Sequence, residues 1–195
     1  MQHFFATNVV GTSELIKLAL INRLKPFVFI SSAIVAIPSD NNKPLNEETN
    51  IYEAIPYQKI NNQYANGYTV NKWASEILLH EAYNRFNLPI TVFRPSMILA
   101  HRQYETQFNI AEVFTRLLLN IINTKMAPKS FYQSDSNISP YYNGLAVDFV
   151  VAAIIKLSKN HHHQLTYNMV NPQNDKVSLD TIVDWLINSG INIKK

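Results

Sequence analysis

The sequence predicts a helix followed by a buried strand within residues 68–93, YTVNKWASEILLHEAYNRFNLPITVF. Apolar side chains recur in its first part at spacings of three and four residues, as in a helix with one apolar stripe. The members of this stripe are Val70, Trp73, Ala74, Ile77, Leu78 and Ala82. Pro89 then precedes residues 90–93, an apolar run typical of a strand buried on both faces. A helix that leads into such a strand is one unit of a parallel α/β sheet.

The same alternation of helices and strands continues on both sides of this stretch. Upstream, the pattern predicts a helix at 8–24, a strand at 27–30 and a long loop with three prolines at 36–63. Downstream, it predicts helices at 110–122, 147–157 and 179–188, and a strand at 165–170. We therefore expect the α/β fold class, a Rossmann-like doubly wound parallel sheet with a small C-terminal substrate-binding portion. The sheet should be incomplete, because none of the 4 glycines belongs to a glycine-rich turn after a first strand.

Composition excludes several classes of function. The chain has no cysteine, which excludes disulfides, thiolate catalysis and cysteine zinc sites. Its net charge of +3 comes from scattered basic residues, so nucleic acid is not an expected partner. Asp148 and Lys156 interrupt the longest apolar stretch, which is too short to span a membrane, and the first residues do not resemble a signal peptide. We expect a cytoplasmic protein without a membrane span.

Two other polar features have plain structural explanations. Residues 161–163 are consecutive histidines, which cannot all converge on one metal ion from a regular element, so no metal site is expected. Thr7 or Asn8 is a candidate N-cap where the first predicted helix begins, and an N-cap is the simplest interpretation of Asn8.

Tyr68 and Lys72 are the first candidates for catalysis. They lie four residues apart on the predicted helix, so both side chains project from one face. A nearby ammonium group favours tyrosinate, and we expect Lys72 to lower the pKa of Tyr68 from about 10 toward the working range. About 0.6 such pairs are expected by chance in a chain of this composition, so the pair alone has little specificity.

Two serines follow the predicted strand at 27–30, at the edge of the sheet where ligands bind. A hydroxyl there can donate a hydrogen bond to a substrate oxygen while the tyrosine delivers its proton. Side chains alternate along a strand, so one of Ser31 and Ser32 should face the cleft. By itself, a serine at a strand end is more often a turn or capping residue.

With these elements in place, the chain resembles the extended short-chain dehydrogenases, and more closely the thioester reductase domains of carboxylic acid reductases and terminal reductase modules. The resemblance runs over nearly the whole chain. It is carried by NVVGTSELIKLAL (8–20), KPFVFISS (25–32), YANGYTVNKWASEILLHEA (64–82), LPITVFRPSMILAHRQY (88–104), FNIAEVFTRLLL (108–119), APKSFY (127–132), NGLAVDFV (143–150) and NPQNDKVSLDTIVDWL (171–186). Together these segments are far more specific than the tyrosine and lysine alone.

The resemblance implies a catalytic set and a cofactor. Ser32, Tyr68 and Lys72 match the family's catalytic Thr/Ser, Tyr and Lys, which favours Ser32 over Ser31. The residues that match the cofactor-binding positions are Tyr68, Lys72, Pro95, Ser96 and Ile98, the last three along the nicotinamide half. The implied cofactor is NADPH, and residues 1–100 would form the catalytic half of an NAD(P)-binding domain.

The resemblance also implies a substrate and a partner. The family reduces an acyl or peptidyl thioester, carried on the phosphopantetheine arm of a carrier domain, to an aldehyde; a coenzyme A thioester is the related alternative. Residues 101–195 would form the substrate and carrier portion, and the residues along the route of the arm would be His101, Arg102, Phe131 and Tyr132.

The chain departs from the family pattern in three places. The glycine-rich turn with the first strands would precede Met1, and the family's tail would follow Lys195. Carboxylic acid reductases usually have an acidic residue where Ser96 stands, so reduction to the aldehyde or on to the alcohol is left open. Three alternative functions are a nucleotide-sugar epimerase or dehydratase, a fatty acyl-CoA reductase, and a non-catalytic fragment that acts as a binding module.

Overall fold

The computed structural model describes residues 5–37, 45–60, 66–104, 110, 112–132, 141–159, 164–172 and 177–195. The histidines at 161–163 lie outside these residues. In chain order the elements are a π-helix η1 (Phe5–Val10), α2 (Gly11–Leu20), β1 (Phe27–Ile30), a 3-10 helix η2 (Ala33–Ala36), α3 (Ile51–Ala54), α4 (Asn66–Phe86), β2 (Ile90–Pro95), β3 (Met97–Leu99), α5 (Val113–Thr124), β4 (Gly144–Ala146), α6 (Val147–Leu157), β5 (Gln164–Met169) and α7 (Leu179–Asn188).

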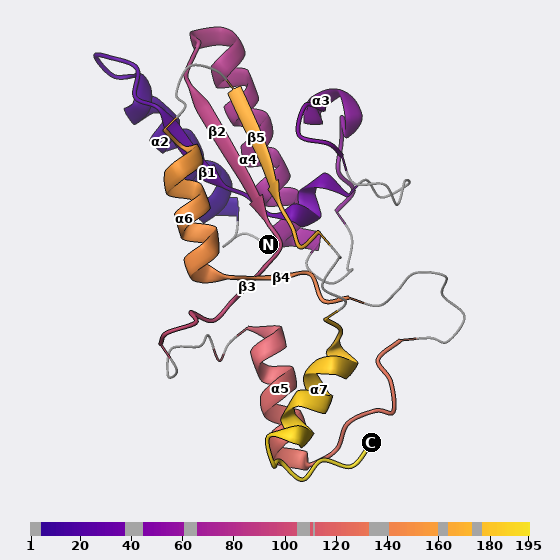
Figure 1. Ribbon diagram of the computed structural model, residues 1–195. Helices are drawn as coiled ribbons and strands as arrows, with labels where there is room; N and C mark the ends of the chain where they lie inside the picture. Colours follow the sequence, from indigo (N-terminus) through magenta and orange to yellow (C-terminus); the bar gives the residue numbers. More distant parts are fainter. Residues whose placement is uncertain are drawn as a thin grey trace. The chain divides into compact units, whose positions relative to one another are not determined.

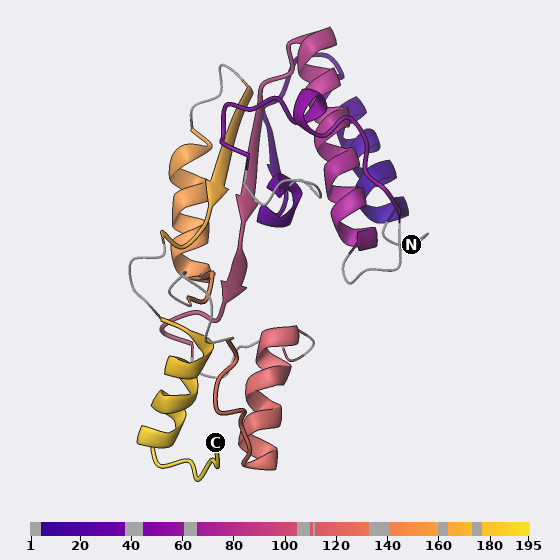
Figure 2. The same cartoon turned by 90° about the vertical axis from the view of Figure 1, so that its right-hand side faces the viewer.

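The central sheet is parallel, as the sequence predicted. Its strands are ordered β1-β2-β5, with Phe27 opposite Ile90 and Ile90 opposite Gln164. Figures 1 and 2 show α2 and α4 on one face of this sheet and α6 on the other. Helices on both faces of parallel strands are the doubly wound α/β arrangement, so the expected fold class is confirmed.

The main hydrophobic core lies between the sheet and the helices α2 and α4. Alternate residues of the buried strands point into it, and small residues on the helices allow close packing. The buried members of this core are Ile16, Ala19, Phe29, Leu79, Ala82, Leu88, Ile90 and Val92. This layer supports the carboxyl ends of β1 and β2, where the candidate site residues lie.

The most buried face of α4 is not the predicted apolar stripe. Its buried residues are Asn71, Ser75, Glu76, Leu79 and Ala82, and of the predicted stripe Ala82 alone is fully buried. Ser75 Oγ donates to the carbonyl oxygens of Asn8 and Asn71, at 2.8 and 2.9 Å. Hydrogen bonds of this kind satisfy polar groups inside the core and let them replace apolar ones.

The first helix also differs from the prediction. Asn8 lies inside η1 and is not an N-cap; Val10 precedes α2 and makes no capping bond with its side chain. The carbonyl of Asn8 accepts hydrogen bonds from Thr12 Oγ1 and Ser75 Oγ. The prediction was therefore wrong about how this helix begins, because the turn is stabilised by a contact with α4 that is distant in sequence.

By its contacts the chain divides into two compact units. Unit 1 contains residues 1–96 and 150–170, and unit 2 contains residues 97–149 and 171–195. Unit 2 contains the parallel pair β3 and β4, with Met97 opposite Gly144, and the helices α5 and α7. Its small core is formed by Ile121, Val183 and Ile193. The division of function between residues 1–100 and 101–195 stays a prediction, although residues 150–170 pack with unit 1.

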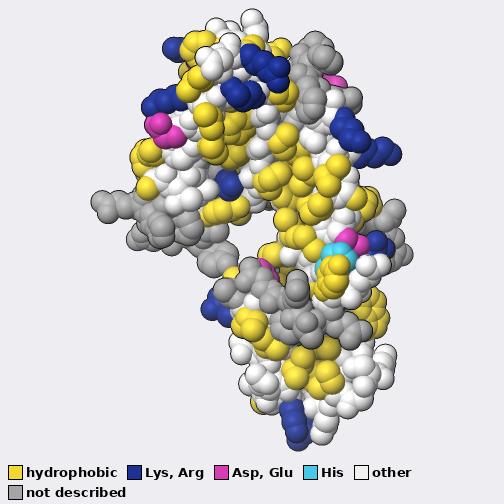
Figure 3. Space-filling view, turned by 90° about the vertical axis from the view of Figure 1, so that its left-hand side faces the viewer, with side chains coloured by type: hydrophobic (Ala, Val, Ile, Leu, Met, Phe, Trp, Pro, Cys, Tyr) yellow, Lys and Arg dark blue, Asp and Glu magenta, His cyan; other side chains and the backbone are white. Residues whose placement is uncertain are grey.

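The sheet is open at β1. Among the described residues, β1 pairs with β2 on one side and with no strand on the other. Val28 and Ile30 are each 38% exposed. Figure 3 faces the side of the molecule on which β1 lies and shows hydrophobic side chains gathered there. The described sheet is therefore incomplete, as expected.

The described part of the chain was searched for a membrane-spanning helix and for a metal site. No helix there has the length and apolar character needed to cross a membrane. Within the same residues, no group of three or more His, Cys, Asp or Glu side chains is placed to hold a metal ion.

Candidate active site

Ser32, Tyr68 and Lys72 come together at the carboxyl end of β1. Tyr68 lies in the first turn of α4, Lys72 follows one turn later, and the Ser32 side chain is close enough to Tyr68 to lower its pKa. Lys72 Nζ donates to the carbonyl oxygen of Ile30 at 2.8 Å and lies 5.9 Å from the centroid of the Tyr68 ring. It also lies 4.9 Å from the centroid of the Phe29 ring. The end of the strand thus holds the lysine beside the tyrosine.

The structure distinguishes the two serines. Ser31 is 3% exposed and donates from Oγ to the carboxylate of Glu76, inside the protein. Its backbone N–H donates to the carbonyl of Phe93 at 2.7 Å, which continues the β1–β2 pairing. Ser32 is half-buried and faces Tyr68. Ser32 is therefore the serine placed to act with the tyrosine, and its catalytic role stays a prediction.

The pKa of Tyr68 is raised above its ordinary value, opposite to the expectation from its spacing to Lys72. Burial disfavours the phenolate and is the largest cause, while the hydrogen bond with Ser32 acts in the other direction. Burial likewise lowers the pKa of Lys72, and the charge of Glu76 opposes that change. The predicted lowering of the Tyr68 pKa was wrong, because the effect of burial exceeds the opposing effect of Ser32.

A buried ion pair lies beneath these residues. Glu76 follows Lys72 by one turn of α4, and Arg94 is near the carboxyl end of β2. Arg94 Nη2 donates to Glu76 Oε2 at 2.6 Å, and Arg94 Nε lies 3.1 and 3.2 Å from the two carboxylate oxygens. Their side chains are 2% and 3% exposed. With Ser31, the pair links β1, α4 and β2, and so positions the helix that carries Tyr68 and Lys72.

Sequence reasoning missed this pair. The sequence pattern gave neither Glu76 nor Arg94 a role. One signal was present: a glutamate one turn after Lys72 faces the same side of the helix as the candidate site. An arginine at the end of a buried strand is a second signal, because a buried arginine needs a carboxylate partner.

The described residues fit the nicotinamide half of a dinucleotide. Pro95 is buried at the end of β2, and the N–H of Ser96 donates to the carbonyl of Met169 at 2.8 Å. Ser96 Oγ is buried and has no hydrogen-bond partner within the described part of the chain. An unused hydroxyl at the carboxyl end of a parallel strand is suited to a ligand, because ligands of doubly wound sheets bind there.

Among the described residues, none forms a comparable place for the pyrophosphate half. A pyrophosphate cradle needs a glycine-rich turn between a strand and a helix. Gly11 follows η1, Gly67 lies within α4, Gly144 begins β4 and Gly190 follows α7. None of the four glycines stands in such a turn.

Three of the predicted site residues belong to the first part of unit 2. Ile98 lies in β3 and is 41% exposed. His101 Nδ1 accepts from the N–H of Gln103, and its ring lies 4.4 Å from that of Tyr104. Arg102 Nε donates to Asp148 Oδ2 at 2.5 Å, and this bond is the main reason that the pKa of Asp148 is lowered. The proposed roles of Ile98, His101 and Arg102 stay predictions.

Phe131 and Tyr132 make contacts that stabilise unit 2. Phe131 packs against the small core of this unit, and its N–H donates to Asp180 Oδ1 at 2.9 Å. Tyr132 Oη accepts from the N–H of Leu179 at 3.1 Å, at the first turn of α7. Both residues thus tie their segment to α7, and their predicted contact with the substrate arm is not tested.

Comparison with known proteins identifies relatives over most of the chain. A profile of a family of NAD-binding domains described as Male sterility protein matches residues 1–154. The chain is 43% identical to a carboxylic acid reductase of Segniliparus rugosus and 41% identical to one of Mycobacterium tuberculosis, over 98% and 93% of its length. It covers 16% of each of these enzymes.

A solved structure shows the same fold. The reductase (R) domain of a nonribosomal peptide synthetase from Mycobacterium tuberculosis aligns with 97% of this chain at a TM-score of 0.87 and 38% identity. The aligned region is 46% of that domain. The chain therefore spans about half the length of the reductase domain it matches.

Proposed function

Because the chain belongs to the Male sterility protein family of NAD-binding domains, we propose that it is the catalytic half of an NADPH-dependent thioester reductase. The substrate would be an acyl or peptidyl thioester on the phosphopantetheine arm of a carrier domain. The products would be an aldehyde and the free thiol of the arm. This proposal agrees with the similarity to carboxylic acid reductases and to a peptide synthetase reductase domain.

The observation that carries the proposal is the grouping of Ser32, Tyr68 and Lys72 at the carboxyl end of β1. NADPH, when bound, would supply a hydride to the carbonyl carbon of the thioester. Tyr68 Oη would give its proton to the carbonyl oxygen as negative charge develops there, while Ser32 Oγ donates a hydrogen bond to the same oxygen. Collapse of the resulting thiohemiacetal would break its C–S bond as the hydroxyl proton is lost and sulfur gains a proton, which gives the aldehyde and the free thiol.

The electrostatics of the site are consistent with proton donation. Burial raises the pKa of Tyr68, so the phenol carries its proton at neutral pH. Once the proton has left, the ammonium group of Lys72 stabilises the phenolate. Glu76 opposes the lowering of the Lys72 pKa and so helps to keep that group charged.

Cofactor binding would be shared between this chain and a glycine-rich segment that its residues do not include. Lys72 is placed to hold the ribose hydroxyls of the nicotinamide half, and Ser96 Oγ offers an unused donor and acceptor at the end of β2. The proposed enzyme is therefore the chain together with a nucleotide-binding segment of the kind found in its family.

The test joins this chain to a glycine-rich nucleotide-binding segment taken from a member of its family. NADPH oxidation and aldehyde formation are measured with a carrier-bound acyl thioester and with the coenzyme A thioester. Tyr68→Phe should lower kcat by about 100-fold or more, because general acid catalysis contributes at least that much.

Tyr83→Phe is the matched control, since Tyr83 lies on the same helix about 22 Å along it from Tyr68 and packs against the core. We expect it to keep full activity. If the joined protein binds NADPH but oxidises none of it with either thioester, or if Tyr68→Phe is as active as the control, the chain is a binding module rather than a reductase.

A further inference from the structure

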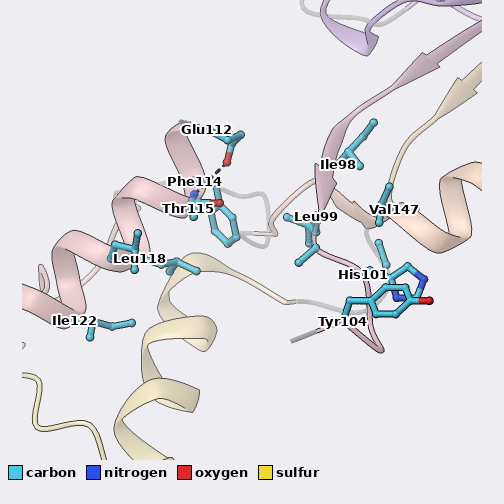
Figure 4. Close-up of a pocket in the computed structure, with 13 residues that line it drawn as sticks. Ile98, Leu99, His101, Tyr104, Glu112, Phe114, Thr115, Leu118, Ile122 and Val147 are labelled. Atoms are coloured by element: carbon cyan, nitrogen blue, oxygen red, sulfur yellow. Dashed lines mark hydrogen bonds between the residues drawn. The ribbon is translucent and has the colours of Figure 1, made fainter. Parts of the chain in front are cut away.

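Unit 2 contains a large cavity of about 860 Å³. One wall is formed by α5, and the opposite wall by β3, the residues after it, and the junction of β4 with α6 (Figure 4). The lining residues used below are Ile98, Leu99, Phe114, Leu118, Ile122 and Val147. Ligand pockets of small molecules have volumes of roughly 300–1,000 Å³. The cavity is therefore large enough for a substrate group.

The ionisable side chains of the cavity already have local partners. Glu112 is the N-cap of α5, and its carboxylate accepts from the N–H of Thr115 at 3.0 Å. His101 Nδ1 accepts from the N–H of Gln103 at 3.0 Å. A polar ligand such as a sugar nucleotide needs several convergent donors and acceptors, whereas this cavity offers mostly hydrocarbon walls.

Helix α5 presents its apolar residues to the cavity in a row. Phe114, Leu118 and Ile122 are separated by four residues each, so they lie one above another along one side of the helix (Figure 4). The row is about 12 Å long at the rise of an α-helix. The Phe114 ring is stacked on that of Tyr142, with 4.4 Å between centroids, which holds this part of the wall in place.

We propose that this cavity binds the hydrocarbon tail of the acyl thioester and makes the chain selective for uncharged aliphatic acyl groups. The proposal rests on the thioester reductase function and adds the class of acyl group. An extended aliphatic tail matches an elongated wall of Phe114, Leu118 and Ile122 and needs no polar partner. Tails of increasing length contact successive turns of α5, so Ile122 helps to limit the length that fits.

The test measures binding to the chain by titration calorimetry, without NADPH. The probes are N-acetylcysteamine thioesters of butanoate, hexanoate, octanoate and decanoate. For the natural sequence, affinity should rise by about two- to fourfold for each added CH₂ until the cavity is filled. A succinyl thioester, which ends in a carboxylate, should bind no better than the butanoyl probe.

Three variants of α5 separate the cavity from general effects on the helix. Leu118→Glu puts a carboxylate into the cavity and should abolish the dependence on chain length. Asn120→Glu makes the same change at an exposed position of α5 and should leave the dependence intact. Ile122→Trp should make affinity level off at a shorter tail, and circular dichroism verifies that each variant is folded.

The outcomes distinguish this proposal from the function on which it rests. The acyl site is overturned if all four probes bind with equal affinity. It is also overturned if affinity depends on chain length in Leu118→Glu and Ile122→Trp as it does in the natural sequence. Either result has this meaning even if the joined protein reduces thioesters. Conversely, the expected length dependence together with no hydride transfer in the joined protein supports the acyl site and removes the reductase function.

Discussion

Replacing Arg94 by methionine should destabilise the chain far more than the same replacement of Arg85. Arg94 of β2 and Glu76 of α4 form a buried pair at 2.6 Å, with side chains 2% and 3% exposed. Arg85 and Glu81, both on α4, form an exposed pair at 3.0 Å. Removing one partner of a buried pair leaves an uncompensated charge and costs about 3–5 kcal/mol. Exposed pairs within one helix contribute about 0.3–0.5 kcal/mol.

The size of the loss should depend on pH. A buried carboxylate that has lost its partner can become neutral by taking up a proton. The free energy needed to protonate it is therefore the most that burial of its charge can cost. For a carboxyl with an ordinary pKa of about 4.3, that cost is about 3.7 kcal/mol at pH 7 and about 1 kcal/mol at pH 5. We expect Arg94→Met to lose about 3–4 kcal/mol at pH 7 and clearly less at pH 5.

Urea denaturation at both pH values measures these losses. Trp185→Phe is introduced throughout, so that fluorescence comes from Trp73, the second of the two tryptophans and a residue of unit 1. The reasoning is refuted if Arg94→Met loses no more than Arg85→Met at pH 7, or if its loss is the same at pH 5. The double variant with Glu76→Leu should regain most of the stability, because no buried charge is left.

The remaining predictions concern a titration, an ion pair and a helix cap. In the joined reductase, Glu76→Gln should move the alkaline fall of kcat/KM to lower pH, because the charge of Glu76 opposes the lowering of the Lys72 pKa. Arg102→Ala should raise the pKa of Asp148 toward its ordinary value in an NMR titration, since their hydrogen bond is the main cause of the lowered pKa. Ser178→Ala should cost about 1 kcal/mol in urea denaturation, because it removes the capping box of α7.

Each of these predictions has a result that would contradict it. Glu81→Gln, on the exposed part of α4, should leave the pH profile in place, and an equal displacement in both variants would exclude a specific effect of Glu76. An unchanged Asp148 titration would show that Arg102 does not pair with it in solution. Ser189→Ala, at the other end of α7, is the control for the cap, and an equal loss there would argue against the capping box.

Local patterns in the sequence predicted most of the regular elements. The helices at 147–157 and 179–188 have the predicted bounds, and the strand at 27–30 does as well. These elements are recognisable because many of the residues in each follow one regular spacing of apolar side chains. The strands β3 and β4 were missed, since each has three residues and pairs with a partner 47 positions away.

Burial of individual side chains was predicted less well. Trp185 belongs to the apolar pattern of the helix at 179–188, a pattern that favours burial, yet it is 54% exposed. Glu76 and Ser75, polar residues of a helix, are among the most buried residues of α4. A polar residue in a helical pattern indicates a solvent-exposed face unless its partner is known. Each of these two has a partner from a distant part of the chain, Asn8 for Ser75 and Arg94 for Glu76.

The sequence by itself determined the class of the fold and the parallel order of helices and strands, because periodicity reflects the sum of many small preferences for burial along a short stretch. The candidate residues Ser32, Tyr68 and Lys72 came from its resemblance to the thioester reductase domains. Tertiary structure decided which serine faces Tyr68, which carboxylate balances Arg94, and the direction of the Tyr68 pKa. Those properties depend on a few atoms from distant positions and on the water that their packing removes, so no local pattern contains them.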